Sequence, residues 1–203
     1  MSLPITRPQA VRAVTWLKAC FGDEIRAAVA APFSIDHICA IACQETAYFW
    51  LPFIDKMTPS SVLARCVLDA TGNTPQTAGQ RNAFPKNTAA FRAKFGSVFT
   101  DQLIEEGNKT RIVRGFKPWS QLYNGYGIFQ YDLQFVLTDR AFFENRMWYD
   151  IRKCLDRCMG ELRRTYARHG TIPEAIRAYN GSGPKARQYR DNVLAYSKIS
   201  ATC

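Results

Sequence analysis

The sequence predicts a mainly α-helical protein with one domain. Apolar residues recur at helical spacing through most of the 203 residues, and Pro and Gly often stand where these segments begin or end. No internal repeat, low-complexity segment or strong linker divides the chain. A chain of this length can bury one sizeable core, so a single domain over 1–203 is the simplest architecture.

Three helices are predicted in the first third of the chain. Each follows or begins with a hydroxyl-bearing residue, which can accept a hydrogen bond from a backbone N–H of the first turn. Pro8 and Pro59 fall in first turns, where their fixed φ suits a helix, and Pro52 ends the second helix. The predicted caps and helices are Thr6 with 7–21, Ser34 with 35–50, and Thr58 with 58–69.

The middle of the chain is rich in loops. Residues 71–86 contain several Gly, Asn and Pro, and we predict a loop there, followed by a helix or broken pair over 88–106 interrupted near Gly96. The β-formers within 108–129, such as Thr110, Ile112 and Val113, predict a small strand or hairpin. Structureless loops of such length are uncommon, so we expect 51–120 to pack as a lobe or insertion.

The last third is predicted to be helical again. A long helix begins at Phe142 or Asn145, runs to Arg168 and ends at Gly170. A short helix over 172–179 and a final one over 184–199 complete the chain.

The charge balance indicates an anionic partner. The net charge is +10, with 47% hydrophobic and 22% charged residues. Nucleic acid, an acidic membrane surface and the bacterial cell wall all qualify. The Lys and Arg residues are dispersed and no nucleic-acid motif is present, so we do not expect nucleic acid to be the partner.

The first residues lack the charged start and apolar stretch of a signal peptide, and no apolar run predicts a transmembrane segment. If the substrate lies outside the cytoplasm, another delivery route must exist, although removal of a signal would also leave this start.

The seven cysteines include two pairs at i, i+4 spacing, Cys39 with Cys43 and Cys154 with Cys158. Such pairs lie on one helix face, and buried Cys usually acts as a small apolar filler. Core packing is the favoured interpretation. A disulfide between the two helices is the main alternative, and a zinc site is disfavoured because the spacing is unusual.

Glu45 is the strongest candidate for chemistry. It lies in the apolar stretch 38–50 and is the only formal charge between Asp36 and Asp55. Apolar surroundings raise the pKa of a carboxyl group, and a carboxyl that stays protonated can act as a general acid. The alternative is an ordinary charge on the solvated face of an amphipathic helix.

Three segments together resemble the goose-type lysozyme and lytic transglycosylase superfamily. The segments are Glu45-Thr46, then Gly125-Tyr-Gly-Ile-Phe-Gln130, then Ala178-Tyr-Asn-Gly181 with Tyr189 and Val193 downstream. The resemblance covers about half of the chain and implies a lysozyme-like fold with a small β-hairpin beside the cleft and a large insertion over 51–120.

The departures from the family pattern are modest except in one place. Thr46 replaces Ser, Ile128-Phe129 replaces Leu-Met, and Asn-Gly-Ser-Gly replaces a shorter Asn-Ala-Gly end. The connection from Glu45 to Gln130 is far longer than is usual, and the resemblance says nothing about this inserted region.

By this resemblance, Glu45 is the general acid that protonates a glycosidic oxygen and Tyr179 lies against its carboxyl group. The implied sugar-binding residues are Thr46, Gly127, Ile128, Phe129, Gln130, Tyr179 and Asn180. Neither His37 nor His169 has the partners for a triad or a zinc site, so we predict no metal and no cofactor.

Asp132 decides between two reactions. An acid two residues after the Gln is similar to the goose-type pattern, and an inverting hydrolase needs a second carboxylate to activate water. We therefore predict a muramidase that hydrolyses the β-1,4 bond between N-acetylmuramic acid and N-acetylglucosamine, with Asp132 positioning water. The alternatives for Asp132 are a helix cap or an ion pair with a nearby Arg.

Other expectations accompany this prediction. A lytic transglycosylase giving anhydro-muramic products is the alternative reaction, and a noncatalytic glycan or nucleic-acid binder is the alternative from another class. We expect a monomer that meets peptidoglycan in the periplasm or cell wall, as a secreted antibacterial toxin effector or by another route. An immunity protein that blocks the cleft is a further conjectured partner.

Overall fold

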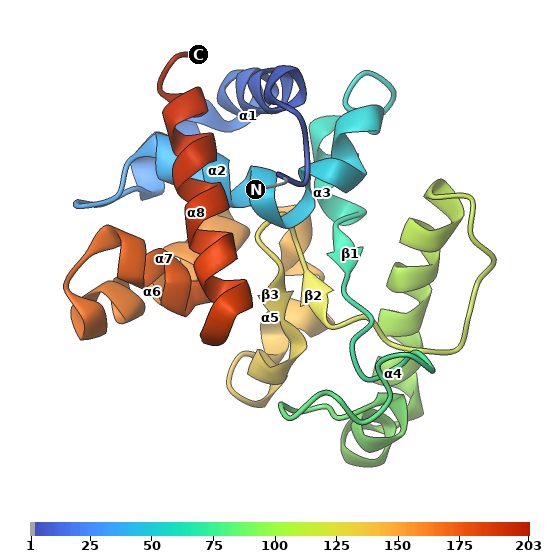
Figure 1. Cartoon of the computed structure of the whole chain (residues 1–203). Helices are drawn as coiled ribbons and strands as arrows, with labels where there is room; N and C mark the ends of the chain where they lie inside the picture. The colour runs from blue at the N-terminus through green and yellow to red at the C-terminus, as the bar shows by residue number, and fades with distance from the viewer. Residues whose placement is uncertain (1–2) are drawn as a thin grey trace. The chain divides into compact units, whose positions relative to one another are not determined.

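The computed structural model describes residues 3–203, which form a mainly helical protein with a small antiparallel sheet (Figure 1). The chain forms two compact units. Unit 1 combines residues 3–59 with residues 151–203, and unit 2 is the continuous stretch Ser60–Asp150.

Unit 1 is built around the apolar helix α2, which packs against α1 and α8. Residues Ile38 to Cys43 are all buried, as expected of a helix that is hydrophobic on nearly all sides. Helix α7 packs against both α6 and α8. The elements of unit 1 are α1 (Arg7–Ala28), α2 (Ile35–Trp50), η1 (Leu51–Phe53), α6 (Ile151–His169), α7 (Ile172–Asn180) and α8 (Gly183–Ser200).

Helix α1 begins where the sequence predicts and ends later. The Thr6 side chain accepts from the backbone N–H of Gln9, and the Gln9 side chain accepts from Thr6 N–H at 2.8 Å. The predicted end at Phe21 was wrong. The helix continues to Ala28 because Ile25, which is also buried, extends the apolar face by one more turn.

The described residues of unit 2 form a three-stranded antiparallel sheet of order β1-β2-β3. Strand β2 pairs with β3 through Gly125 opposite Asp132 and Tyr126 opposite Tyr131, which confirms the predicted hairpin in this region. The first element, α3 (Pro59–Ala64), begins at the boundary with unit 1. The others are β1 (Val67–Leu68), α4 (Thr88–Val113), β2 (Gly125–Tyr126), β3 (Tyr131–Asp132), η2 (Leu133–Leu137), α5 (Arg140–Glu144) and η3 (Met147–Tyr149).

Several predicted boundaries in unit 2 were wrong. Helix α3 ends at Ala64, and β1 occupies part of the segment predicted to be helical up to Asp69. Thr110 does not begin a strand, because α4 continues to Val113 and the Thr110 hydroxyl donates to the carbonyl of Arg65 at 2.9 Å. The interruption of α4 at Gly96 is confirmed by a φ of 80°.

The predicted helix from Phe142 or Asn145 begins only at Ile151. Arg146 has a φ of 52°, which breaks a regular helix and separates α5 from η3. The predicted end at Gly170 is confirmed, since this residue has a φ of 75° directly after α6.

The predicted role of the paired cysteines in core packing is confirmed. Cys39, Cys43, Cys154 and Cys158 are all buried in unit 1. All seven cysteines lie among the described residues, and none of them forms a disulfide there. Burial raises the pKa of Cys39 to about 12, so this thiol stays protonated at neutral pH.

Candidate active site

Glu45 lies on α2, on the side of the helix that α8 approaches. Its neighbours Cys43, Thr46 and Ala47 are buried, whereas Glu45 itself is half-buried. The carboxyl group is therefore set against an apolar helix without being sealed in the core.

Tyr189 of α8 holds the Glu45 carboxyl group. Its hydroxyl donates a hydrogen bond to Oε1 of Glu45 at 2.6 Å, and its side chain is buried. Burial, and next the charge of Glu45, raise the pKa of Tyr189 well above its ordinary value. The hydroxyl therefore keeps its proton at neutral pH and remains a hydrogen-bond donor.

Tyr179, at the end of α7, packs on Tyr189. The two rings are stacked with centroids 6.4 Å apart and planes 23° apart. The Tyr179 side chain is also hydrogen bonded to the thiol of Cys158, and burial, followed by Cys158 and Glu45, raises its pKa. The structure thus brings Glu45, Tyr179 and Tyr189 together within unit 1, as the resemblance implies for the first two.

Thr46 and Asn180 have contrasting environments. Thr46 is fully buried, and its hydroxyl accepts a hydrogen bond of 2.9 Å from the indole of Trp50. Asn180 is exposed and precedes Gly181, whose φ of 124° ends α7. Thr46 is therefore part of the core of unit 1, and sugar contacts by either residue stay predictions.

The turn between β2 and β3 contains the predicted subsite residues of unit 2. Gly127 has a φ of 78° and Gln130 a φ of 52°, so both adopt the left-handed conformation that a tight connection requires. The side chains of Ile128 and Phe129 are buried. The backbone of Ile128 and Phe129 is therefore the part available for a sugar contact, which is the contact that the resemblance implies.

The Gln130 side chain is used to shape this turn. Its Nε2 donates to the carbonyl of Gly127 at 2.9 Å and to that of Cys66, just before β1, at 3.2 Å. A Cβ at position 125 would lie 2.2 Å from Oε1 of Gln130, so Gly125 is needed for the amide to take this place. Gly125 itself lies in β2, ahead of the turn.

Asp132 performs both of the structural tasks considered as alternatives. One carboxylate oxygen accepts from the backbone N–H of Gln134 at 2.7 Å, which caps η2. The same oxygen pairs with Arg81 at 2.5 Å, and Arg81 also donates to the carbonyl of Pro85 at 2.9 Å. A role of Asp132 in activating water stays a prediction, and the geometry accounts for the residue without it.

Glu106 is a buried acid that the sequence does not single out. It is completely enclosed in unit 2 and forms ion pairs with Arg65, Lys109 and Arg146. Burial alone would raise the pKa of Glu106, but hydrogen bonds from Lys109, Tyr149 and Arg146 hold it below the ordinary value. Because its partners satisfy it, we assign Glu106 a structural role.

Tyr189 and Cys158 are the residues around Glu45 to which the sequence assigned no role. Tyr189 lies far from Glu45 along the chain, and a single downstream Tyr does not show which carboxyl it meets. Cys158 was interpreted only as a core residue. The available signal was the i, i+4 pair on α6, which placed Cys158 on the buried face without indicating Tyr179 as its partner.

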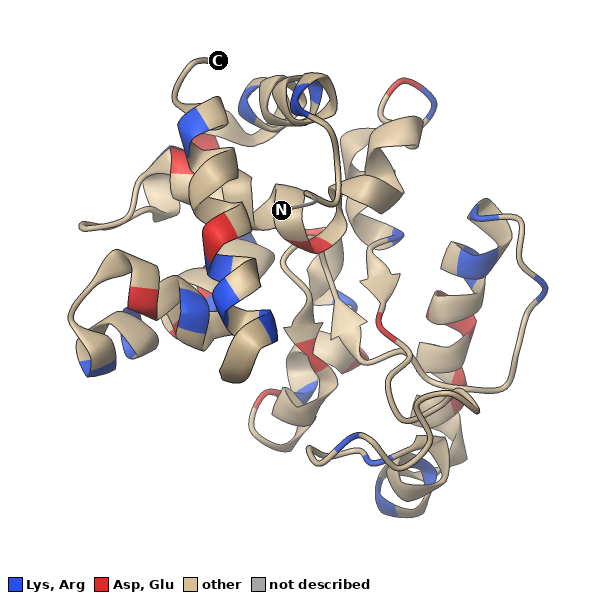
Figure 2. Cartoon of the chain, viewed as in Figure 1, with Lys and Arg blue, Asp and Glu red and all other residues tan. Residues whose placement is uncertain are grey.

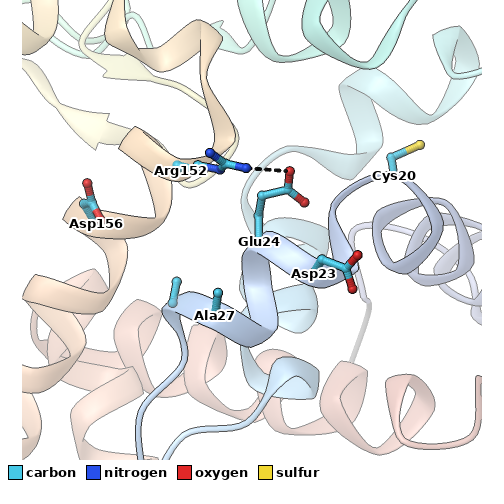
Figure 3. A pocket seen from close by; sticks show the side chains of 7 residues that line it. Cys20, Asp23, Glu24, Ala27, Arg152 and Asp156 are labelled. Atoms are coloured by element: carbon cyan, nitrogen blue, oxygen red, sulfur yellow. Dashed lines mark ion pairs between the residues drawn. The ribbon is translucent and has the colours of Figure 1, made fainter.

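A separate hollow of about 670 Å³ lies between α1 and α6 in unit 1 (Figure 3). Its charged lining includes Asp23, Glu24, Arg152 and Asp156, and Arg152 pairs with Glu24 at 3.6 Å. Glu45 is not among the residues that line it. An acidic lining with a bridging Arg does not by itself indicate a ligand.

Two kinds of feature are absent from residues 3–203, a metal site and a membrane-spanning helix. Within that range no three His, Cys, Asp or Glu side chains gather as a metal site would require. None of the helices described there has the length and apolar character needed to cross a membrane. Comparison of the chain with protein-family models, with curated proteins and with solved structures finds no match.

Proposed function

We propose that this protein is a muramidase that cleaves the glycan strand of peptidoglycan, with Glu45 as the general acid. The observation that carries the proposal is the half-buried Glu45 carboxyl group held by the hydroxyl of Tyr189 at 2.6 Å. An acid catalyst needs a fixed orientation and partial exclusion of water, and this arrangement supplies both. The proposal includes a lysozyme-like arrangement of the helices, which rests on the resemblance of the three sequence segments.

The proposed reaction begins with proton transfer. Protonated Glu45 gives its proton to the glycosidic oxygen as the bond from that oxygen to C1 of N-acetylmuramic acid breaks, so the N-acetylglucosamine unit leaves as an alcohol. Tyr189 holds Oε1 of Glu45 during this step and keeps its own proton. In the hydrolytic reaction a water molecule then adds to C1 and gives up a proton to a base.

Asp132 is the predicted base, and its contacts favour a second candidate reaction. Its carboxylate is occupied by Arg81 and by the backbone N–H of Gln134. Lytic transglycosylation needs one carboxyl group, because a hydroxyl of the N-acetylmuramic acid itself takes the place of water and forms the anhydro product. A structurally occupied Asp132 is compatible with that reaction.

The proposal also concerns location and partners. Peptidoglycan lies outside the cytoplasm, so the protein would be delivered to the periplasm or wall, for example as an antibacterial toxin effector. Such a toxin requires an immunity protein in the cell that makes it. The active form would be a monomer, and a noncatalytic glycan binder is the alternative from another class.

The test is product analysis of purified peptidoglycan treated with the wild type, Glu45→Gln and Asp132→Asn in parallel. We expect the wild type to release fragments with reducing N-acetylmuramic acid ends and Glu45→Gln to release none while remaining folded. Fragments with anhydro-muramic ends would show that the reaction is transglycosylation and not hydrolysis. Cleavage unchanged by Glu45→Gln would refute the assignment of the acid, and binding without any cleavage would favour the noncatalytic binder.

A further inference from the structure

The C-terminal end of α4 and the loop that follows it are positively charged. Between Glu106 and Asp132 the sequence contains four basic residues and no acidic one. Figure 2 shows the Lys and Arg positions along the upper end of α4 and the adjoining loop. The basic residues of this surface, which we call the 111–119 surface, are Arg111, Arg114 and Lys117, and its apolar residues are Ile112, Phe116, Pro118 and Trp119.

The 111–119 surface is rigidly built. Gly115 has a φ of 75°, its N–H donates to the carbonyl of Ile112, and the N–H of Phe116 donates to that of Arg111 at 2.9 Å. These two bonds form a Schellman motif, which fixes the direction in which the chain leaves the helix. The side chain of Asn108 then exchanges two hydrogen bonds with the backbone of Trp119, at 2.9 and 3.0 Å.

Arg111 is held between two aromatic rings. Its guanidinium lies 4.4 Å from the centroid of Trp119 and 5.6 Å from that of Phe116, and its Nε donates to the carbonyl of Lys117 at 2.6 Å. Arg114 lies over the Phe116 ring at 5.0 Å. The two guanidinium groups are therefore held in place before any partner arrives, which reduces the entropy cost of binding.

A structural role alone does not account for this surface. Cations near a helix C-terminus do interact favourably with the helix dipole. That effect does not require the exposed apolar side chains, yet Ile112 is 60% exposed and Phe116 is 48% exposed. An exposed surface with fixed cations and apolar groups suits a partner with anionic groups on an amphipathic framework.

We propose that the 111–119 surface binds the anionic glycan of the bacterial wall. Its residues are not among those proposed to cleave the glycan. This inference rests on the proposed function. The carboxylates of the peptide stems and the anionic polymers of the wall would pair with Arg114 and Lys117, while apolar faces of the sugars contact the exposed side chain of Ile112. Single-stranded nucleic acid fits less well, because stacking of bases requires aromatic faces and Arg111 and Arg114 occupy those of Trp119 and Phe116.

The experiment is co-sedimentation with intact, purified peptidoglycan, in the Glu45→Gln background so that the strand is not cut. Arg114→Glu/Lys117→Glu should weaken binding about tenfold, because each change removes an attraction and adds a repulsion. The matched control reverses two exposed basic residues of α6, Arg163→Glu/Arg168→Glu, with the same change in net charge. We expect the control to weaken binding far less.

Equal losses in the two double variants would overturn the proposal, since net charge would then explain adhesion. Tighter binding to single-stranded DNA than to the wall, lost in Arg114→Glu/Lys117→Glu alone, would also overturn it. Failure of the proposed function would appear differently, as wall cleavage that Glu45→Gln leaves unchanged. The two proposals can therefore fail separately.

Discussion

The hydroxyl of Tyr189 lies 2.6 Å from Oε1 of Glu45, although the two residues are 144 positions apart in the sequence. A donor at this distance stabilises the ionised carboxylate more than the protonated acid. The bond therefore has two effects. It fixes the orientation of Glu45, and it favours the ionised form of the carboxyl group.

Tyr189→Phe should alter the pH dependence of wall cleavage. Without the donor, the protonated form of Glu45 persists to higher pH, so the alkaline limb of the pH–rate profile should move up by about one pH unit. We also expect a lower maximal rate, because the carboxyl group loses its fixed orientation. The measurement is the rate of release of soluble fragments from peptidoglycan between pH 4 and pH 9.

Tyr166→Phe is the matched control, since Tyr166 lies in the same unit and makes an edge contact with Phe33. Its pH profile should equal that of the wild type. A Tyr189→Phe profile with an unmoved alkaline limb would show that Tyr189 only packs against α2.

Asp132→Asn should separate the structural role of Asp132 from the catalytic one. Loss of its charge weakens the ion pair with Arg81, which is nearly buried, and should lower the free energy of unfolding by about 1 to 2 kcal/mol. Arg81→Gln should have a similar effect, and Asp101→Asn, which breaks an exposed pair with Arg92, should change stability much less. Chemical denaturation measures all three.

The activity of folded Asp132→Asn then assigns its role. If hydrolysis by inversion is correct, this variant should lose nearly all wall cleavage while Arg81→Gln retains it. Equal and small losses of activity in both variants would leave Asp132 with its structural contacts alone.

Glu106→Gln should be strongly destabilising. The change leaves Arg65, Lys109 and Arg146 around a neutral side chain, so we expect a loss of about 3 kcal/mol in the free energy of unfolding. Glu105→Gln is the neighbouring control, because Glu105 is exposed and pairs only with Lys109 among the ion pairs described for residues 3–203. Comparable unfolding midpoints for the two variants would contradict a stabilising role for the buried cluster.

Stability should fall as the pH is lowered below about 6.5, through His37. Burial holds the pKa of His37 below its usual value of 6.5, and neutral Nδ1 accepts from the N–H of Ser34 at 3.1 Å. The unfolded chain therefore binds the proton more readily, so this contribution is present above pH 6.5 and is lost as the pH falls through the lowered pKa.

The check is thermal unfolding between pH 5 and pH 8. His37→Gln should flatten the dependence in this range, whereas His169→Gln, at an exposed position, should leave it unchanged. The chain contains no other histidine that could supply the effect. A pH dependence that survives in His37→Gln would exclude this explanation.

Some helix boundaries of unit 1 were predictable because their signals are local. The cap at Thr6, the apolar run of α2 and Gly170 each act within a few residues, and the structure has all three. The error at Thr110 lies where a distant contact decides. Thr110 and Val113 have β-forming side chains, which favour a strand. Both instead lie in α4, which packs against β1, and the Thr110 hydroxyl donates to the carbonyl of Arg65.

The candidate site shows the same division. Glu45 was identifiable as one charge in an apolar segment, whereas its bond with Tyr189 joins helices that are distant in the sequence. The bond between Gln130 and Cys66 likewise depends on the pairing of β1 with β2. A single sequence indicates which side chains are unusual for their surroundings, but not which distant group contacts each of them.

The discontinuity of unit 1 has a consequence for synthesis on the ribosome. Helix α2 is made before unit 2, but α8, which packs on it and carries Tyr189, is made only after unit 2. Unit 2, in contrast, is continuous and can fold while the rest is still being translated. A growing chain therefore exposes the apolar surface of α2 until α8 has been made, and only then can Tyr189 hold Glu45 in place.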